Sequence, residues 1–440
     1  MQENVMVIEK LSIKDFRGIH DLDLDLRGKS AVLFGINGVG KSSVLASVSL
    51  LYANIINRLV RTRFKQTVKF EESDIKIGKA SARIKAEFRF GQEKGTYCYS
   101  RAVYRKRNPI ILSKDLERLV AHYRERYLPE DETDDENNFI DRSQESNIPI
   151  FINYGVNRLV IKTPLRIRKT EDYGQFAAFE KAIENQIAFS KLFEWFLEQE
   201  LYETQQQKLD PAYEDIPLKA VKKAMLVMLD GYRDVHITAK PYSMKVYRDQ
   251  EVLDILQLSD GEKCTLALFG DLARRLAIAN PGLDDPLKGA GVALIDEIEL
   301  HMHTSWQRKV IRVLKDTFPN VQFIITTHSP QVIGECGQDF QIFSLYRTED
   351  EIGCDGSGSY FGLDSNSLLE DAFKTDSVNR DIKDRVRQMY QCIEDKDFLG
   401  AETCIGQIDD LTNGRNPDTA RGRILIRKGR RANAADKEKS

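Results

Sequence analysis

Residues 35–43, Gly-Ile-Asn-Gly-Val-Gly-Lys-Ser-Ser, have the residue types and spacing of a phosphate-binding loop. They fit the pattern G-x-x-x-x-G-K-[ST], in which glycines let successive backbone N–H groups point at phosphate oxygens. Lys41 would place a positive charge on the β and γ phosphates, and the Ser42 hydroxyl would bind Mg²⁺. The predicted nucleotide-binding residues are Gly35, Asn37, Gly38, Gly40, Lys41, Ser42 and Ser43. A predicted buried strand at 31–34 precedes the loop, and a predicted helix at 42–52 turns its positive end toward the phosphates.

Two carboxylates follow an apolar strand in the second half of the chain. Residues 292–295 are apolar, and Asp296 and Glu297 come directly after them. We expect Asp296 to lie next to the strand of the phosphate loop and to hold Mg²⁺, and Glu297 to polarise the attacking water. His328 ends the next apolar strand, 323–327, where a sensor of the γ-phosphate would lie. A single histidine is more often structural, but this position favours a catalytic role. The set predicts a Mg²⁺-dependent ATPase.

A third motif, Leu-Ser-Asp-Gly-Glu at residues 258–262, opens a predicted helix that ends at Ala279. The order of phosphate loop, long insertion, Leu-Ser-Asp-Gly-Glu, strand with Asp-Glu and strand ending in His resembles the ABC-type ATPase family. Within it the chain looks like the RecF/SMC-like branch, over about residues 1–110 and 235–350. The resemblance implies a head-to-tail dimer with two ATP molecules at its interface. The signature residues that would act in trans there are Ser259, Asp260, Gly261 and Glu262.

More narrowly, the chain is similar to small anti-phage defence ATPases of the Septu and retron type (PtuA-like). The matching features are residues 151–158, the helix centred on Trp195, residues 296–303 and residues 364–366. This resemblance implies a homodimer or larger homo-oligomer, a separate HNH-type nuclease subunit, and contact with DNA. The alternatives are a RecF-like DNA-repair ATPase without a nuclease and, less favoured, a transporter ATPase.

The resemblance implies an α/β fold, namely an ABC-ATPase head with a mixed sheet core and an antiparallel lobe, a helical insertion and a helical C-terminal segment. The expected parts are 1–110 and 235–364 as the two halves of the head, 111–234 as the insertion, and 365–440 as helices with a basic tail. Hydrophobic spacing predicts particular elements. These are a hairpin of 82–90 with 96–104, a strand at 148–154, a helical region at 176–207, a helix at 218–229, short strands within 235–258 and a glycine-rich hairpin at 353–362.

Composition indicates a cytoplasmic protein that does not enter a membrane. The formal net charge is −3, so any DNA contact must come from local patches. Six cysteines show no C-x-x-C pair, which favours reduced thiols. The charged N-terminus is unlike a signal peptide, and no apolar run approaches about 18 residues.

Several features leave alternatives open. The basic stretch 58–69 is either a solvated helix end and loop or a contact surface, and the basic tail at 421–431 is either a disordered, solubilising extension or a docking segment. His301 and His303 lack a third metal ligand. The family glutamine that joins Mg²⁺ has no clear counterpart, and residues 153–155 are only a candidate region.

Overall fold

The computed structural model describes the chain except for residues 1–5, 61–63, 92, 103–113, 128–146, 159–173, 240, 349–350, 357–359, 374–378 and 438–440. The chain forms two compact units, Met1–Leu363 and Asp364–Ser440, which we call the head unit and the C-terminal unit. Within the expected insertion, the acidic run at 130–136 lies outside the described residues. Across the described ranges, no helix combines the length and apolar character that a membrane span needs.

A six-stranded mixed sheet forms the centre of the head unit, in the order β13-β12-β3-β11-β10-β6. Its strands are β3 (Ser30–Phe34), β6 (Ile150–Tyr154), β10 (Gly291–Ile295), β11 (Val321–Thr327), β12 (Phe340–Arg347) and β13 (Ile352–Gly356). All are parallel except β13, which pairs antiparallel with β12. The residues of β3, β6, β10 and β11 are all buried, as expected for parallel strands covered on both faces.

The expectation that the Asp296 strand lies next to the phosphate-loop strand is wrong. β11 pairs with both β3 and β10 and therefore separates them. The reason is the crossover through α6 (Thr304–Thr317), which returns the chain to the sheet between the two strands. The glycine-rich hairpin expected at 353–362 differs in its first part, because Gly353 and Gly356 lie in β13, which pairs with β12; residues 357–359 lie outside the described residues.

An antiparallel sheet, ordered β2-β1-β4-β5, packs beside this core. Its strands are β1 (Met6–Phe16), β2 (Ile19–Asp25), β4 (Ser81–Phe90) and β5 (Glu93–Ala102). The hairpin of β4 and β5 confirms the prediction from alternating residues, although its turn is shorter than expected. The α/β fold class, with a mixed sheet, an antiparallel lobe and added helices, is thereby confirmed.

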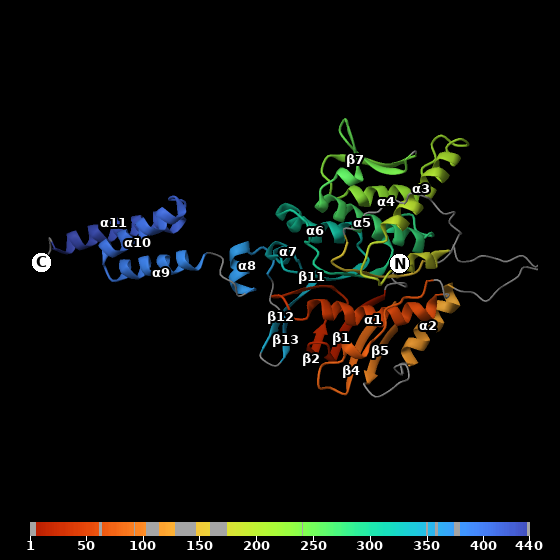
Figure 1. The fold of residues 1–440 in the computed structure, drawn as a ribbon, viewed down its shortest axis with the longest axis horizontal. Helices are drawn as coiled ribbons and strands as arrows, with labels where there is room; N and C mark the ends of the chain where they lie inside the picture. The colour runs from red at the N-terminus through yellow and green to blue at the C-terminus, as the bar shows by residue number, and fades with distance from the viewer. Residues whose placement is uncertain are drawn as a thin grey trace, which may run out of the picture. The chain divides into compact units, whose positions relative to one another are not determined.

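The helices of the head unit lie on both sides of the central sheet (Figure 1). In that view α1 (Lys41–Leu59) and α2 (Lys114–Tyr127) lie with the antiparallel strands, and α3 to α6 lie on the other side. α3 spans Phe189–Gln206, α4 Ile216–Leu226, α5 Asp260–Ala279 and the short α7 Pro330–Gly334. The predicted strands within 235–258 are a small antiparallel sheet of β7 (Tyr232–Thr238), β8 (Ser243–Arg248) and β9 (Glu251–Asp254).

The prediction of helical structure throughout 176–207 is wrong in its first part. Residues Gln175–Phe179 form a 3₁₀ turn, and an irregular stretch continues to the start of α3. Lys181 and Asn185 there have positive φ values of 53° and 59°. The backbone of this stretch hydrogen bonds to other segments, for example from Asn153 N to Ala182 O at 2.8 Å. These tertiary bonds replace the helical ladder.

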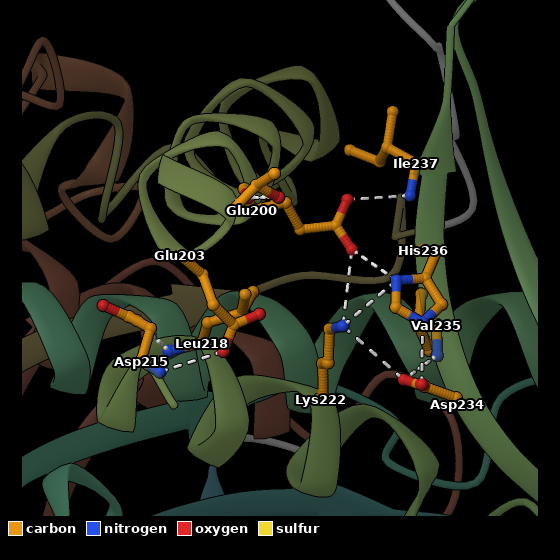
Figure 2. A network of polar contacts seen from close by, with 10 residues as sticks. Glu200, Glu203, Asp215, Leu218, Lys222, Asp234, Val235, His236 and Ile237 are labelled. Atoms are coloured by element: carbon orange, nitrogen blue, oxygen red, sulfur yellow. Dashed lines mark hydrogen bonds and ion pairs between the residues drawn. The ribbon is translucent and has the colours of Figure 1, made fainter. Parts of the chain in front are cut away.

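A polar network ties the insertion helices to the small sheet (Figure 2). Glu200 of α3 lies 2.8 Å from Nδ1 of His236 on β7, and its other oxygen accepts a 2.9 Å bond from Ile237 N. Lys222 of α4 is 3.3 Å from the same Glu200 carboxylate. Hydrogen bonds to Asp234 and then Glu200 raise the pKa of His236 to about 9. The network therefore holds a charged histidine at neutral pH.

The C-terminal unit consists of α8 (Ser365–Asp371), α9 (Arg380–Glu394), α10 (Phe398–Thr412) and α11 (Pro417–Lys437). Its core includes Ile382, Met389, Ile405, Ile408 and Ile426. The basic tail is thus not disordered: it is helix α11, which places Ile426 in the core of the unit.

Candidate functional site

The phosphate loop joins β3 to α1 with the conformation that its glycines predict. Gly40 has φ 90° and precedes the first residue of α1. A Cβ atom on Gly35 would lie 2.2 Å from the carbonyl oxygen of Leu345, so no side chain fits there. Lys41 is buried and its Nζ donates to the carbonyl oxygens of Gly35 at 2.9 Å and Ile36 at 3.0 Å. Burial lowers the pKa of Lys41 to about 8, although Glu297 and Asp296 oppose this shift.

The structure brings Ser42 and Asp296 together although they are far apart in sequence. Ser42 Oγ donates to Asp296 Oδ1 at 3.2 Å, and Thr326 Oγ1 donates to the same oxygen at 2.5 Å. Mg²⁺ prefers oxygen ligands and is usually held by one or two carboxylates together with waters. A hydroxyl and a carboxylate at the edge of a parallel sheet fit this requirement, so the pair predicted to bind the metal is suitable in type and position.

Glu297 and His328 face one another beside this pair. The Glu297 Oε1 atom lies 4.0 Å from His328 Nε2, and about a third of each side chain is exposed. Glu297 has a left-handed backbone, with φ 46°, and its N–H donates to Thr326 Oγ1 at 2.8 Å. Burial, followed by the charge of Lys41, lowers the pKa of His328 below its ordinary value. The imidazole is therefore largely neutral at pH 7.

Two further residues, not predicted from the sequence, hold these carboxylates and the histidine in place. The buried Arg158 donates from Nη1 to the carbonyl oxygen of Asp296 at 2.5 Å and from Nη2 to that of Glu297 at 2.6 Å. Glu299 accepts the backbone N–H of His328 at 2.5 Å and the hydroxyl of Thr327 at 2.7 Å. Arg158 ends the 151–158 segment and Glu299 follows the Asp-Glu pair, but neither position carries a pattern that reveals these bonds.

In the candidate region 153–155, the side chains of Asn153 and Tyr154 make hydrogen bonds in the interior of the head unit. Asn153 is buried, and its amide donates to Ser49 Oγ of α1 at 2.7 Å and to Asn185 Oδ1. Tyr154 OH donates to Asp271 of α5 at 2.9 Å. An exposed amide, Asn157, follows in the chain.

Asn157 lines a cavity of about 250 Å³ together with Ser42 and Asp296. Arg17 also lines it and is held by Asp74, which accepts from its Nε at 2.9 Å. No residue of the Leu-Ser-Asp-Gly-Glu motif is among the described residues that line this cavity. The amide of Asn157 and the guanidinium of Arg17 therefore lie in the same cavity as the two residues predicted to bind Mg²⁺.

A fully buried ionic cluster connects α5 to this edge of the sheet. Asp271 accepts hydrogen bonds from Arg275 Nε at 2.7 Å and Arg274 Nη2 at 2.8 Å, in addition to that from Tyr154. The carbonyl oxygen of Tyr154 in turn accepts the backbone N–H of Asp296 at 2.8 Å. Tyr154 thus connects α5, the helix that begins at the signature motif, to Asp296, the predicted metal ligand, through one hydrogen bond to each.

The signature residues form the start of α5. Ser259 is the N-cap, and its N–H and hydroxyl both donate to Glu262 Oε2, at 2.8 Å and 2.7 Å, in a capping box. Ser259 and Asp260 are exposed, whereas Gly261 is buried, and a Cβ on it would lie 2.4 Å from the carbonyl oxygen of His301.

His301 and His303 precede helix α6. Within the described ranges, no group of three or more His, Cys, Asp or Glu side chains is placed to hold a metal ion. His303 instead caps α6, where its Nδ1 accepts the backbone N–H of Ser305 at 3.3 Å. The six cysteines are unpaired, and two of them, Cys264 of α5 and Cys404 of α10, are buried within helices.

The chain is similar to known proteins in sequence and in fold. The "Retron Ec83 probable ATPase" of Escherichia coli is 26% identical over 391 residues, covering 74% of this chain and 69% of that protein. The "Septu protein PtuA" of Bacillus thuringiensis is 22% identical over 333 residues, covering 75% and 73%. A solved SMC head bound to the C-winged helix domain of ScpA superposes with a TM-score of 0.49 at 12% identity, covering 79% of this chain and 97% of that one.

A family model described as "AAA domain, putative AbiEii toxin, Type IV TA system" matches residues 30–334, which is more than half of the chain. The match begins at β3 and ends at α7, so it contains the phosphate loop, Asp296, Glu297 and His328. The chain therefore belongs to the AAA_21 family and is an ATPase of that family.

Proposed function

We propose that this chain is the ATP-binding and hydrolysing subunit of an anti-phage defence complex that controls a separate, HNH-type nuclease subunit. The observation that carries the proposal is the meeting of Lys41, Ser42, Asp296 and Glu297 at one sheet edge, in a chain similar to a retron ATPase and to Septu PtuA. The separate nuclease subunit is part of the proposal because the chain is similar to Septu PtuA.

In this proposal each residue of the site has one task. Lys41 would pair with the β and γ phosphates of ATP, while Ser42 and Asp296 would hold Mg²⁺, which neutralises charge developing on the phosphate oxygens. Glu297 would orient and deprotonate the attacking water. The neutral His328 would donate a hydrogen bond to a γ-phosphate oxygen. Asn157, which lines the same cavity, is our candidate for the amide that joins the metal shell.

The proposal includes a homodimer, in which the signature of one protomer completes the site of the other. Ser259 and Asp260 are exposed at the N-terminal end of a 20-residue helix. Such an end carries partial positive charge and binds anions. The buried Gly261 would allow the helix to start close to the backbone of His301 rather than contact the nucleotide itself.

Two variants test the hydrolytic roles. Glu297→Gln keeps the shape of the side chain and should retain ATP while lowering turnover by about 10²–10⁴-fold. Lys41→Ala should lose ATP binding itself. Filter binding of labelled ATP and phosphate release, measured on both proteins, separate the two effects. Equal loss of binding in the two variants would contradict the assigned roles.

Co-purification tests the partner. The genes next to the one for this chain are searched for an HNH nuclease, which is tagged and co-expressed with the chain, and stable recovery of both proteins is the expected result. An active ATPase that recruits no such nuclease but binds DNA would favour the RecF-like alternative.

A further inference from the structure

Helix α11 has one face turned into the C-terminal unit, and this fixes which residues face outward. Thr419 and Ile426 are buried, and a Cβ on Gly422 would lie 2.7 Å from Met389 Sδ. A Cβ on Gly429 would lie 2.7 Å from the Phe398 ring. These inward positions recur every three or four residues, so the opposite side of the helix is exposed.

The cations of α11 divide between the two sides. Arg423 pairs with Asp409 of α10. Arg430 lies 2.8 Å from Glu402, also of α10, and stacks its guanidinium 6.0 Å from the centroid of Phe398. These two arginines therefore stabilise the unit itself.

Four other cations form what we call the outer row: Arg421, Arg427, Lys428 and Arg431. All four are exposed. Within the described part of the chain, none of their side chains makes a hydrogen bond or an ion pair, whereas those of Arg423 and Arg430 do. The sequence from 421 to 431 contains no Asp or Glu. The outer row is thus a cluster of four cations on a chain whose net charge is −3, and the nearest preceding acid of the helix, Asp418, accepts a hydrogen bond from Tyr390 OH.

We propose that the outer row binds the phosphate backbone of double-stranded nucleic acid. At 1.5 Å per residue, the row spans about 15 Å, which is long enough to cross a major groove about 12 Å wide. An α-helix about 10–12 Å in diameter can also enter that groove. Because phosphates repeat without regard to sequence, the row would bind duplexes of any sequence.

The arrangement of apolar side chains favours a polyanion over a protein or a membrane. Ile424 and Leu425 are 54% and 40% exposed, and Ile424 lies on the outward side one turn from both Arg421 and Lys428, so cations adjoin this exposed aliphatic side chain. The centre of a protein interface is depleted of charge. An interfacial membrane helix needs a continuous apolar face, and two aliphatic side chains do not supply one.

The number of cations predicts the salt dependence. Four phosphate contacts give a slope of about −3.6 for log K against log salt concentration, so affinity should fall about 150-fold between 50 and 200 mM NaCl. Neutralising two cations of the row should reduce the slope to about −1.8.

The experiment measures fluorescence anisotropy of a labelled 20-base-pair duplex of arbitrary sequence with the full chain, without nucleotide, at several NaCl concentrations. The test variant is Arg421→Gln with Lys428→Gln. The control is Arg423→Gln with Arg430→Gln, which removes the same charge from the same helix at internally paired positions. The test variant should lose about half of the salt slope, whereas the control should keep the slope of the unmodified chain.

Equal loss in the two double variants, or no loss in the test variant, would overturn the proposal. Equal binding to phosphatidylserine vesicles over the same salt range would also overturn it, by assigning the row to a membrane surface. Circular dichroism of both variants verifies that α11 is still folded. The inference does not rest on ATP hydrolysis, so an inactive ATPase that still binds the duplex would refute only the proposed function.

Discussion

The buried ionic cluster around Asp271 gives a stability prediction that the structure makes quantitative. Asp271 and Arg275 have fully buried side chains, and Arg274 is only 4% exposed. Asp271→Asn keeps the shape of the residue but leaves two buried guanidinium groups without a counter-charge. Breaking a buried pair in this way costs about 3–5 kcal/mol. That is a large share of the roughly 5–15 kcal/mol by which domains are stable.

The pH dependence gives an independent check on this value. Burial raises the pKa of Asp271, but Arg275 and Arg274 outweigh that effect and lower the pKa to about 2, from an ordinary value of 3.8. A depressed carboxyl pKa stabilises the fold above the ordinary pKa, and this contribution is lost as pH falls from about 4 toward 2. The shift corresponds to about 2–3 kcal/mol, which is of the same order as the mutational cost.

The cost of Asp271→Asn can be measured by urea unfolding, and the two tryptophans make this measurement specific for the head unit. Trp195 lies in α3 and Trp306 in α6, so tryptophan fluorescence during urea unfolding reports that unit alone. The matched control is Asp249→Asn, which removes a carboxylate from an ion pair with Arg233 that is more than 70% exposed. That change should cost about 0–1 kcal/mol. If Asp271→Asn costs no more than the control at pH 7, or if its cost persists unchanged at pH 3, the reasoning fails.

Three further perturbations test the site and its supports. Ser259→Arg should block hydrolysis while each protomer still binds ATP, and normal turnover in this variant would refute the proposed dimer. Arg158→Met, which removes both bonds to the carbonyl groups of Asp296 and Glu297, should lower kcat about 10²-fold with an unchanged ATP Kd, and Arg158→Lys should recover part of the loss. His236, whose raised pKa stabilises the fold fully below pH 6.5, should lose that contribution as pH rises through about 9. The urea midpoint of His236→Gln should therefore approach that of the unmodified chain above pH 9.

The sequence predicted the parts of the site that lie in contiguous motifs. The phosphate loop needs particular glycines, Lys41 and Ser42 at fixed spacing, so its pattern is readable. Arg158 could not be predicted in the same way. It binds two backbone carbonyl groups, and because every residue has such a group, no sequence pattern marks this contact. The strand order could not be predicted either, because hydrophobic runs identify strands but not their neighbours in the sheet. The position of β11 between β3 and β10 was therefore not predicted.

Elsewhere, tertiary contacts overrode local periodicity. Ile183 has helical spacing with its apolar neighbours and is buried as predicted. Its N–H nevertheless donates to Gln66 Oε1 at 3.1 Å rather than to a residue one turn earlier. Arg423 and Arg430 are a similar case, because their acidic partners on α10 could be found only from the fold.

The position of β3 in the central sheet has a consequence for synthesis of the chain. Both neighbours of β3 come from the second half of the sequence, and Ser30 bonds to Phe323, 293 residues away. At about 5–20 residues per second, β3 leaves the ribosome roughly 15–60 s before β11. The apolar strand has no sheet partner during that time, and pairing over such a separation is slow. The phosphate loop, although it is the first motif to be translated, is therefore among the last parts of the head unit to reach its final form.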